Sequence, residues 1–223
     1  MSIGIFGTIT RMVSISKEQR LFILFGLFVN FLIGMNILGA KIVPLGPFSV
    51  SVAFLIVPWS FLTTDIIAEV YGQKKARQMV WAGLVSLAVF LFIVVLFVAL
   101  PSAARFKHNA EYNQIFGTSA RIVAASIVAF LLSQYNDIWS FWKLRTITKK
   151  RFLWFRSSVS SVLSMVVDTF AFMFLAFYLL TPLFTFWFVI QMIIPYLIFK
   201  IIWSFCSTPL VYAGANWLRG GGK

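Results

Sequence analysis

The chain has 223 residues, of which 61% are hydrophobic and 11% charged, and its mean hydropathy is +0.93. This balance excludes a soluble domain and indicates one domain, residues 1–223, of helices that cross a membrane several times. The net charge of +13 would favour nucleic acid as the partner of a soluble protein. Here the basic residues stand between apolar runs, where they set topology and contact lipid headgroups, so we expect no nucleic-acid partner.

Six apolar segments each come near the ~20 residues that cross the hydrocarbon core of a bilayer. In chain order they are residues 21–40, 50–72, 79–100, 119–140, 158–180 and 184–217. The last is too long for one straight crossing, and we expect it to kink or break at Pro195 or Pro209. Pro58 predicts a discontinuity in the second segment, and Pro44 and Pro47 mark a short connector before it.

The basic residues predict the orientation of these segments. If the N-terminus is cytoplasmic, the cytoplasmic segments hold most of the 19 Lys and Arg residues, namely Arg11, Lys17, Arg20, Lys74, Lys75, Arg77, Lys143, Arg145, Lys149, Lys150, Arg151, Arg156, Arg219 and Lys223. An excess of Lys and Arg on the cytoplasmic side is the general rule for membrane proteins. The fold class that we predict is therefore all-α, with six transmembrane helices and both termini in the cytoplasm.

Two segments have a distinct surface pattern. In the first predicted span, residues 21–40, Gly26, Asn30 and Gly34 recur every four residues, which predicts a small, polar face for close packing against another helix. In the third predicted span, residues 79–100, the stretch 87–100 has no polar side chain. Such a surface suits lipid and a second copy of the chain equally, so a homodimer stays open.

Four of the six acidic residues lie within or at the ends of predicted spans: Asp65, Glu69, Asp137 and Asp168. A charged residue at the centre of a membrane helix costs about 2.5–3.5 kcal/mol on insertion scales, so these positions need a use or a partner. Asp65 and Glu69, four residues apart, share a helix face. Asp168 is the deepest and shares a predicted helix face with Ser157, Ser161 and Ser164, a stripe that we expect to point into the bundle.

Lys200 in the last span is the obvious buried cation for one of these acids, and Lys41 could serve from the first connector. One buried lysine cannot neutralise three or four carboxylates, so we expect at least two of the acids to line a water-filled substrate cavity. The alternative is structural pairing, above all for Asp137, because Lys143 and Arg145 follow it closely in the sequence.

The sequence lacks residues that the main classes of intramembrane enzyme require. Cys206 is the only cysteine, which excludes an internal disulfide and a thiolate metal site. His108 is the only histidine and falls in a predicted outside loop, so an intramembrane serine protease would lack its base and a metalloenzyme its ligands. There is no GxxxxGK loop for a nucleoside triphosphate. Asp65 and Asp168 could correspond to the two catalytic aspartates of an aspartyl intramembrane protease, but the residues that flank them are not typical of that family. We expect no enzyme activity, no cofactor and no metal.

Several segments resemble one known family. The string TTDIIAEVYGQKKAR at residues 63–77 closely resembles the signature of the queuosine precursor transporter family, also called the vitamin uptake transporter family. The further matching segments are NILGAK at 36–41, LLSQYNDIWSFWKLR at 131–145, residues 154–168, and Lys200 with Thr208 and Pro209. The resemblance as a whole extends over most of residues 25–215.

The resemblance implies a multi-pass importer in the bacterial inner membrane that carries 7-deazaguanine bases for the queuosine modification of tRNA. Its cargo would be 7-cyano-7-deazaguanine, 7-aminomethyl-7-deazaguanine or queuine, and its fold would be similar to the substrate-binding subunits of energy-coupling-factor transporters. Proton coupling, facilitated diffusion and an external ATPase all stay open as energy sources, and we favour a stand-alone carrier. The alternative is a substrate-binding subunit for another vitamin or nucleobase that works with a separate ATPase module.

The chemistry of such a base is compatible with the intramembrane residues. A deazaguanine presents a ring N–H and an exocyclic amine on one edge, and a carboxylate accepts both as a bidentate pair. Asp65, Glu69 or Asp168 could supply this carboxylate. We expect Asp65→Asn, Glu69→Gln and Asp168→Asn each to abolish uptake and to leave the protein in the membrane. The ring oxygen needs a donor. The full predicted substrate-binding set is Asn36, Asp65, Glu69, Gln134, Asp137, Asp168 and Lys200, in which Asn36, Gln134 and Lys200 are the candidate donors.

Overall fold

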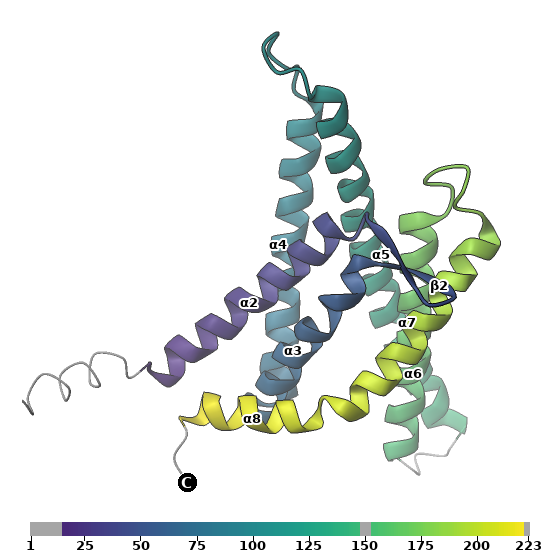
Figure 1. The fold of residues 1–223 in the computed structure, drawn as a ribbon. Coiled ribbons are helices and arrows are strands. Elements are labelled where there is room, and N and C mark those ends of the chain that lie inside the picture. The colour runs from purple at the N-terminus through teal and green to yellow at the C-terminus, as the bar shows by residue number, and fades with distance from the viewer. Residues whose placement is uncertain (1–14, 148–152, 221–223) are drawn as a thin grey trace, which may run out of the picture.

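The computed structural model describes the backbone of residues 15–147 and 153–220 and, within these ranges, every side chain except those of residues 141, 145, 153–158, 161, 204 and 205. The elements are α2 (Lys17–Leu38), β1 (Ile42–Leu45), β2 (Phe48–Ser51), the 3-10 helix η1 (Val52–Leu55), α3 (Val57–Tyr71), α4 (Gln73–Ala99), α5 (Asn109–Ile147), α6 (Leu153–Phe177), α7 (Phe186–Cys206) and α8 (Thr208–Arg219) (Figure 1). Parts of the predictions fall outside the described residues: Arg11, Lys149, Lys150, Arg151 and Lys223, and the side chains of Arg145, Arg156, Ser157 and Ser161.

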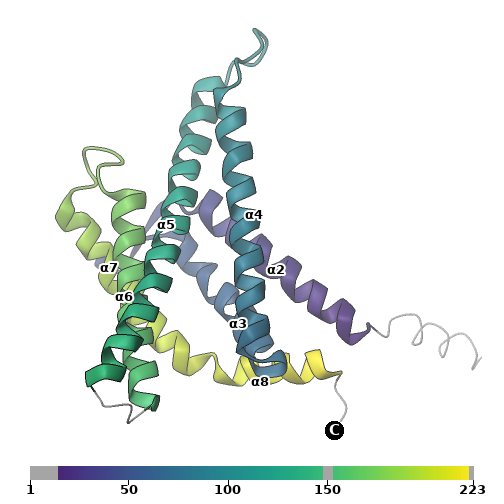
Figure 2. The ribbon, with the colours of Figure 1, turned by 180° about the vertical axis from the view of Figure 1, so that it is seen from behind.

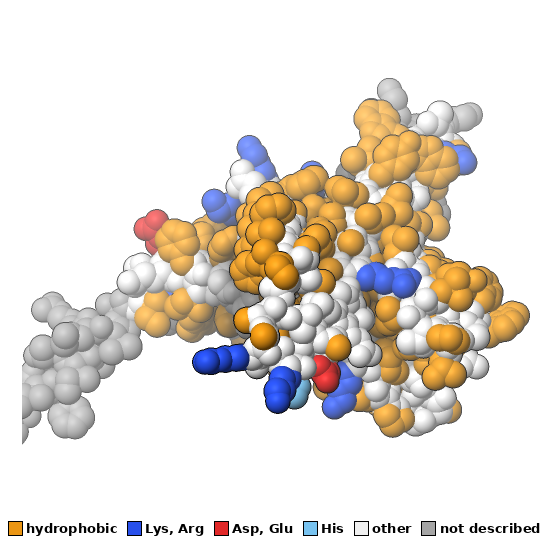
Figure 3. Space-filling view, turned by 90° about the horizontal axis from the view of Figure 1, so that it is seen from above, with side chains coloured by type: hydrophobic (Ala, Val, Ile, Leu, Met, Phe, Trp, Pro, Cys, Tyr) orange, Lys and Arg blue, Asp and Glu red, His pale blue; other side chains and the backbone are white. Residues whose placement is uncertain are grey.

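Within the described residues, five helical segments are long and apolar enough to cross a membrane. They are Lys17–Leu38, Val52–Tyr71, Gln73–Ala99, Asn109–Leu144 and Phe186–Trp203, and a shorter apolar segment covers Val162–Phe177 of α6. Many large hydrophobic side chains are exposed, among them Phe92, Leu183 and Trp187. In Figure 3 hydrophobic side chains lie over all parts of the face, beside several Lys and Arg groups. An apolar surface of this extent fits an integral membrane protein, because a soluble monomer rarely exposes one.

The first connector is more regular than the prolines predicted. Residues 42–51 form an antiparallel hairpin that pairs Ile42 with Ser51 and Leu45 with Phe48, so the fold is helical with one small two-stranded sheet. The hairpin replaces the start of the predicted second span. Helix α3 begins only at Val57, with Pro58 in its first turn, which confirms the predicted discontinuity. Proline is favoured there because the first helical N–H groups have no intrahelical acceptor.

The long last segment breaks in two, as its length predicted. Helix α7 ends at Cys206 and α8 begins at Thr208, with Pro209 in the first turn of α8. Pro195 lies inside α7 without ending it. In Figure 1 α8 turns away from α7 and runs beneath α3, where Leu218 joins a buried apolar cluster with Ile67.

The helices form two packed groups. One apolar cluster joins α2, α3, α4 and α8 and contains Leu24, Phe28, Ile66, Ile67, Ala76, Met79 and Leu218. The other joins the hairpin with α5, α6 and α7 and contains Val50, Ile122, Ala125, Met173, Ala176, Phe177, Val189, Met192, Ile193 and Tyr196. Helix α5 links the groups, because it runs beside α4 over one half of its length and beside α6 over the other (Figure 2).

The small-residue face predicted on the first span does not serve for close packing in this structure. A Cβ atom added at Gly26 or Gly34 would meet no atom of the described residues within 4 Å. The close approach is made instead by Gly83 on α4, where a Cβ would lie 2.6 Å from Phe28 Cε1 and 2.7 Å from Leu32 Cδ1. Helix α2 therefore turns large side chains, rather than its glycines, toward α4.

Candidate functional site

An ion pair joins the middle of α6 to α7. Lys200 Nζ lies 3.1 Å from Asp168 Oδ2 and donates a second hydrogen bond of 2.9 Å to Thr169 Oγ1. The lysine side chain is 10% exposed and the aspartate 34%. Asp168 lies about 14 Å from the end of α6 at Phe177, given a rise of 1.5 Å per residue. The pair therefore lies well inside the apolar segment Val162–Phe177, away from its C-terminal end.

Helix α3 brings an aromatic ring to this pair. The centroid of the Phe61 ring is 5.9 Å from Lys200 Nζ, within the range of a cation–π contact. Two further ring contacts involve residues of α7 on either side of Lys200: Phe54 of η1 with Phe199 at 4.1 Å, and Trp59 of α3 with Trp203 at 6.4 Å. The contacts of Phe61 and Trp59 connect α3, in one packed group, to α7, in the other, whereas Phe54 packs within the group that contains α7.

Asp65 follows Phe61 by one helical turn and therefore lies on the same face of α3. Its side chain is exposed, and it makes no hydrogen bond or ion pair with any described residue. A carboxylate without a protein partner thus lies one turn from the aromatic ring that contacts the lysine. Such an acceptor inside a membrane segment is available for water or for a ligand.

Asp137 has a different environment, between α5 and α6. Its Oδ1 atom accepts hydrogen bonds from the hydroxyls of Ser160 and, at 3.5 Å, Ser164, and Ser160 also donates to the Asp137 carbonyl at 2.7 Å. Lys143 forms no ion pair with this carboxylate. Its amine lies instead over the ring of Trp139, 4.5 Å from the centroid. The structure therefore joins Asp137 to hydroxyl groups that fasten α5 to α6.

The predicted amide donors lie apart from the ion pair. Asn36 is buried, donates to the Leu32 carbonyl at 2.7 Å and accepts from Ser126 of α5 at 2.6 Å. Gln134 is half-buried on α5, and its side chain makes no hydrogen bond with any described residue. Asn36 thus has its hydrogen bonds satisfied between α2 and α5, whereas the amide of Gln134 is available.

Glu69 takes part in a contact with α8. Its Oε1 atom lies 3.3 Å from Arg219 Nη2, which also lies 3.4 Å from the Glu69 carbonyl. Both side chains are about half exposed, at 43% and 50%. Close by in the fold, Arg20 Nη1 donates to the Trp217 carbonyl at 2.6 Å. The two arginine contacts hold α8 against α2 and α3.

Of the seven site residues predicted from the sequence, Asp168 and Lys200 are in direct contact in the structure. The prediction did not include Phe61, Thr169, Ser160 and Ser126, which contact predicted site residues. Thr169 and Phe61 had a signal in the sequence, because one follows Asp168 directly and the other precedes Asp65 by one turn. The two serines had none, since their partners lie on other helices.

A family model described as "Putative vitamin uptake transporter" matches residues 51–214. The chain belongs to this family. The matched range contains six of the seven predicted site residues and leaves out only Asn36. Membership and the apolar helices together make this a multi-pass bacterial membrane protein.

Curated relatives carry more specific names. A protein of Bacillus subtilis (strain 168) named "Probable queuosine precursor transporter" is 30% identical over 154 residues, which cover 69% of this chain and 66% of the relative. The "Queuosine precursor transporter" of Escherichia coli (strain K12) is 30% identical over 121 residues, 54% of this chain and 52% of the relative. A third, from Haemophilus influenzae, named "Probable queuosine precursor transporter", is 26% identical over 122 residues, 54% of this chain and 49% of the relative.

The chain thus spans about half to two thirds of the length of the curated relatives that it matches. No solved structure matches it.

Proposed function

We propose that this protein imports queuosine precursors, the 7-deazaguanine bases, across the bacterial inner membrane. The observation that carries the proposal is membership of the vitamin uptake transporter family together with three similar proteins that are named as transporters of such precursors. A carrier role also fits the intramembrane polar residues, which a purely structural membrane protein does not need.

The base binds, in this proposal, between α3 and the Asp168–Lys200 pair. Asp65 accepts the ring N–H and the exocyclic amine of the base, since its carboxylate has no hydrogen bond or ion pair to a described residue and a bidentate pair of this kind is strong and selective. Lys200 donates to the ring oxygen. Phe61 offers an apolar face, one turn from Asp65 and 5.9 Å from the lysine amine, for the planar ring.

The other predicted residues have supporting roles. Asp168 holds the Lys200 amine in place through the 3.1 Å contact. It also offers a second carboxylate for the cationic amine of 7-aminomethyl-7-deazaguanine or queuine. Gln134 is an available donor or acceptor on α5. Asn36 and Asp137 position α2, α5 and α6, and Glu69 acts through α8.

The architecture that we propose has six spans with both termini in the cytoplasm, α6 being the span added to the five apolar segments. The excess of Lys and Arg in the segments that would be cytoplasmic supports this orientation. We propose a fold similar to the substrate-binding subunits of energy-coupling-factor transporters, and a carrier that works without an ATPase module.

Binding and transport are tested separately. Purified protein is heated with queuine, the two deazaguanine precursors, guanine or riboflavin, and a ligand that binds the folded state raises the melting temperature as RT ln(1 + [L]/Kd). We expect a shift with deazaguanines and none with riboflavin. Uptake of the stabilising base into liposomes that contain this protein alone then tests the carrier. Binding without uptake would favour a substrate-binding subunit of a larger transporter. An unchanged melting temperature at deazaguanine concentrations far above micromolar would contradict the proposed cargo.

A further inference from the structure

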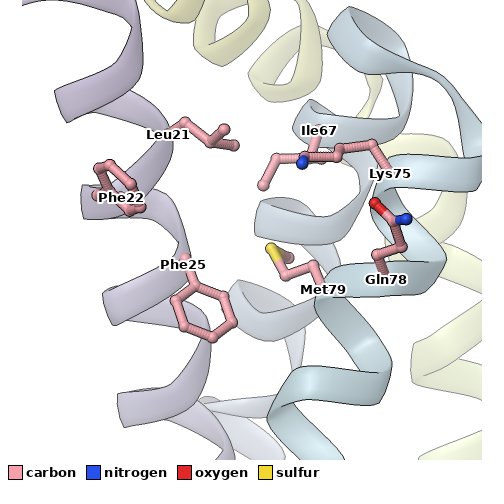
Figure 4. Close-up of a pocket in the computed structure, with 7 residues that line it drawn as sticks. All are labelled: Leu21, Phe22, Phe25, Ile67, Lys75, Gln78 and Met79. Atoms are coloured by element: carbon pink, nitrogen blue, oxygen red, sulfur yellow. The ribbon is translucent and has the colours of Figure 1, made fainter.

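An open groove of about 200 Å³ lies between α2 and the corner at which α3 meets α4 (Figure 4). Its lining is mostly apolar and consists of Leu21, Phe22, Phe25, Ile67, Lys75, Gln78 and Met79. The volume is below the range of about 300–1,000 Å³ that is usual for pockets that enclose a whole small molecule. The groove is thus suited to part of a flexible apolar chain rather than to a nucleobase.

The polar residues of this groove gather on α4. Lys75 and Gln78 stand one turn apart, and in Figure 4 the side chain of Lys75 extends from α4 toward α2. Neither side chain makes a hydrogen bond or ion pair with any part of the chain that the structure describes. Lys75 is therefore a cation beside an apolar groove, with no carboxylate partner among those residues.

The surroundings of the groove place it at a membrane boundary. Lys75 is the third residue of α4, and Leu21 lies in the second turn of α2, so the groove adjoins the ends of both helices. Basic residues gather at these ends: Lys17, Arg20, Lys74, Lys75 and Arg77. Glu18 lies on the same face of α2 as Leu21, but it does not line the groove and does not pair with Lys75. The local charge is positive.

We propose that this groove binds an anionic phospholipid of the surrounding bilayer. One acyl chain lies against Leu21, Phe25 and Met79, and the phosphate lies at Lys75, with Gln78 as a further donor. Basic pockets between transmembrane helices on the cytoplasmic side are suited to anionic headgroups, because they combine charge with an apolar wall. The site is separate from Lys200 and Asp168 and does not depend on the proposed transport function.

The headgroup contact is tested with the full-length protein in detergent. Native mass spectrometry measures binding of dioleoyl-phosphatidylglycerol and dioleoyl-phosphatidylcholine to the delipidated protein. We expect the protein to prefer phosphatidylglycerol. In Lys75→Ala the affinity for phosphatidylglycerol should fall about fivefold, which is the usual contribution of one basic residue near anionic lipid. Lys74→Ala is the matched control, because this neighbouring lysine does not line the groove. Equal affinity for the two lipids, or equal loss in the two variants, overturns the proposal.

The acyl chain contact is tested in the same assay. Leu21→Trp fills the groove and should weaken the binding of both lipids. Glycerophosphoglycerol, which lacks acyl chains, should not compete with intact phosphatidylglycerol for the protein. Full competition by that headgroup would mean a phosphate site without an apolar component and overturns the proposal. Unchanged lipid binding in Leu21→Trp with a changed share of dimer would instead assign the groove to a second copy of the chain.

Discussion

Lys200 of α7 and Asp168 of α6 form a contact of 3.1 Å between two apolar helices, and Thr169 accepts a further hydrogen bond from the same amine. The pair satisfies one of the four carboxylates that lie in or near predicted spans. Asp137 is held by serine hydroxyls and Glu69 by Arg219. Asp65 alone of the four has no hydrogen bond or ion pair with a residue that the structure describes.

Asp65→Asn should lower initial uptake of a deazaguanine by tenfold or more while the protein still reaches the membrane. The reason is that the amide cannot accept both donors of the base, and a hydrogen bond to a charged group contributes about 1.5–3 kcal/mol. The measurement is uptake of labelled base per amount of membrane protein. Glu18→Gln is the matched control, since Glu18 lies on the exposed first turn of α2. Normal uptake by Asp65→Asn would remove this residue from the proposed site.

Lys200→Met should destabilise the fold by about 1–3 kcal/mol, because it leaves Asp168 without its cation inside the membrane. The effect is smaller than for a fully buried pair, since Asp168 is 34% exposed. Adding Asp168→Asn should restore much of the stability, measured as melting temperature, but not uptake. Recovery of uptake along with stability would mean that the pair is structural and does not contact the base.

Glu69→Gln and Arg219→Gln should lower uptake to a similar extent, and the double variant should be no worse than either one. Each change removes the same 3.3 Å contact between α3 and α8, and double-mutant cycles detect such coupling. The measurement is again uptake, with surface expression as the reference. If Glu69→Gln abolished uptake while Arg219→Gln left it normal, Glu69 would act on the base directly, as the sequence alone suggested.

Ser160→Ala should cost about 1–3 kcal/mol of stability and leave the affinity for the base unchanged. The buried Ser160 hydroxyl donates to the Asp137 carboxylate and carbonyl, and its loss leaves these acceptors without that donor. Ser86→Ala is the control, because among the described residues the Ser86 hydroxyl bonds within its own helix alone, to the Ala82 carbonyl. A large change in ligand affinity, at unchanged melting temperature, would place Asp137 in the binding site.

Gly83→Ala should destabilise the protein by about 1–3 kcal/mol, whereas Gly26→Ala should be neutral or slightly stabilising. The added methyl at Gly83 would meet Phe28 at 2.6 Å and Leu32 at 2.7 Å, and overpacking of this kind forces the neighbours to move. At Gly26 the methyl meets no atom of the described residues within 4 Å, and alanine favours the helix. Melting temperatures of the two variants compare them directly, and the reverse order would contradict the packing of α2 on α4.

The sequence by itself determined the class of the protein, the positions of its apolar segments and two of its breaks. These are local properties: the length of an apolar run decides whether it can cross a bilayer, and a proline limits the helix at its own position. Helix α3 accordingly starts next to Pro58 and α8 next to Pro209. The family was also legible, because residues 63–77 form a specific signature within the matched range.

Only the tertiary structure decided which polar group meets which. Lys200 is 32 residues from Asp168, Arg219 is 150 residues from Glu69, and Ser160 is 23 residues from Asp137. Residue spacing orders side chains around one helix, but contacts between helices depend on how each helix is rotated and tilted against its neighbours. For the same reason the close packing of α2 falls on Gly83 of α4 and not on the regular glycines of α2 itself.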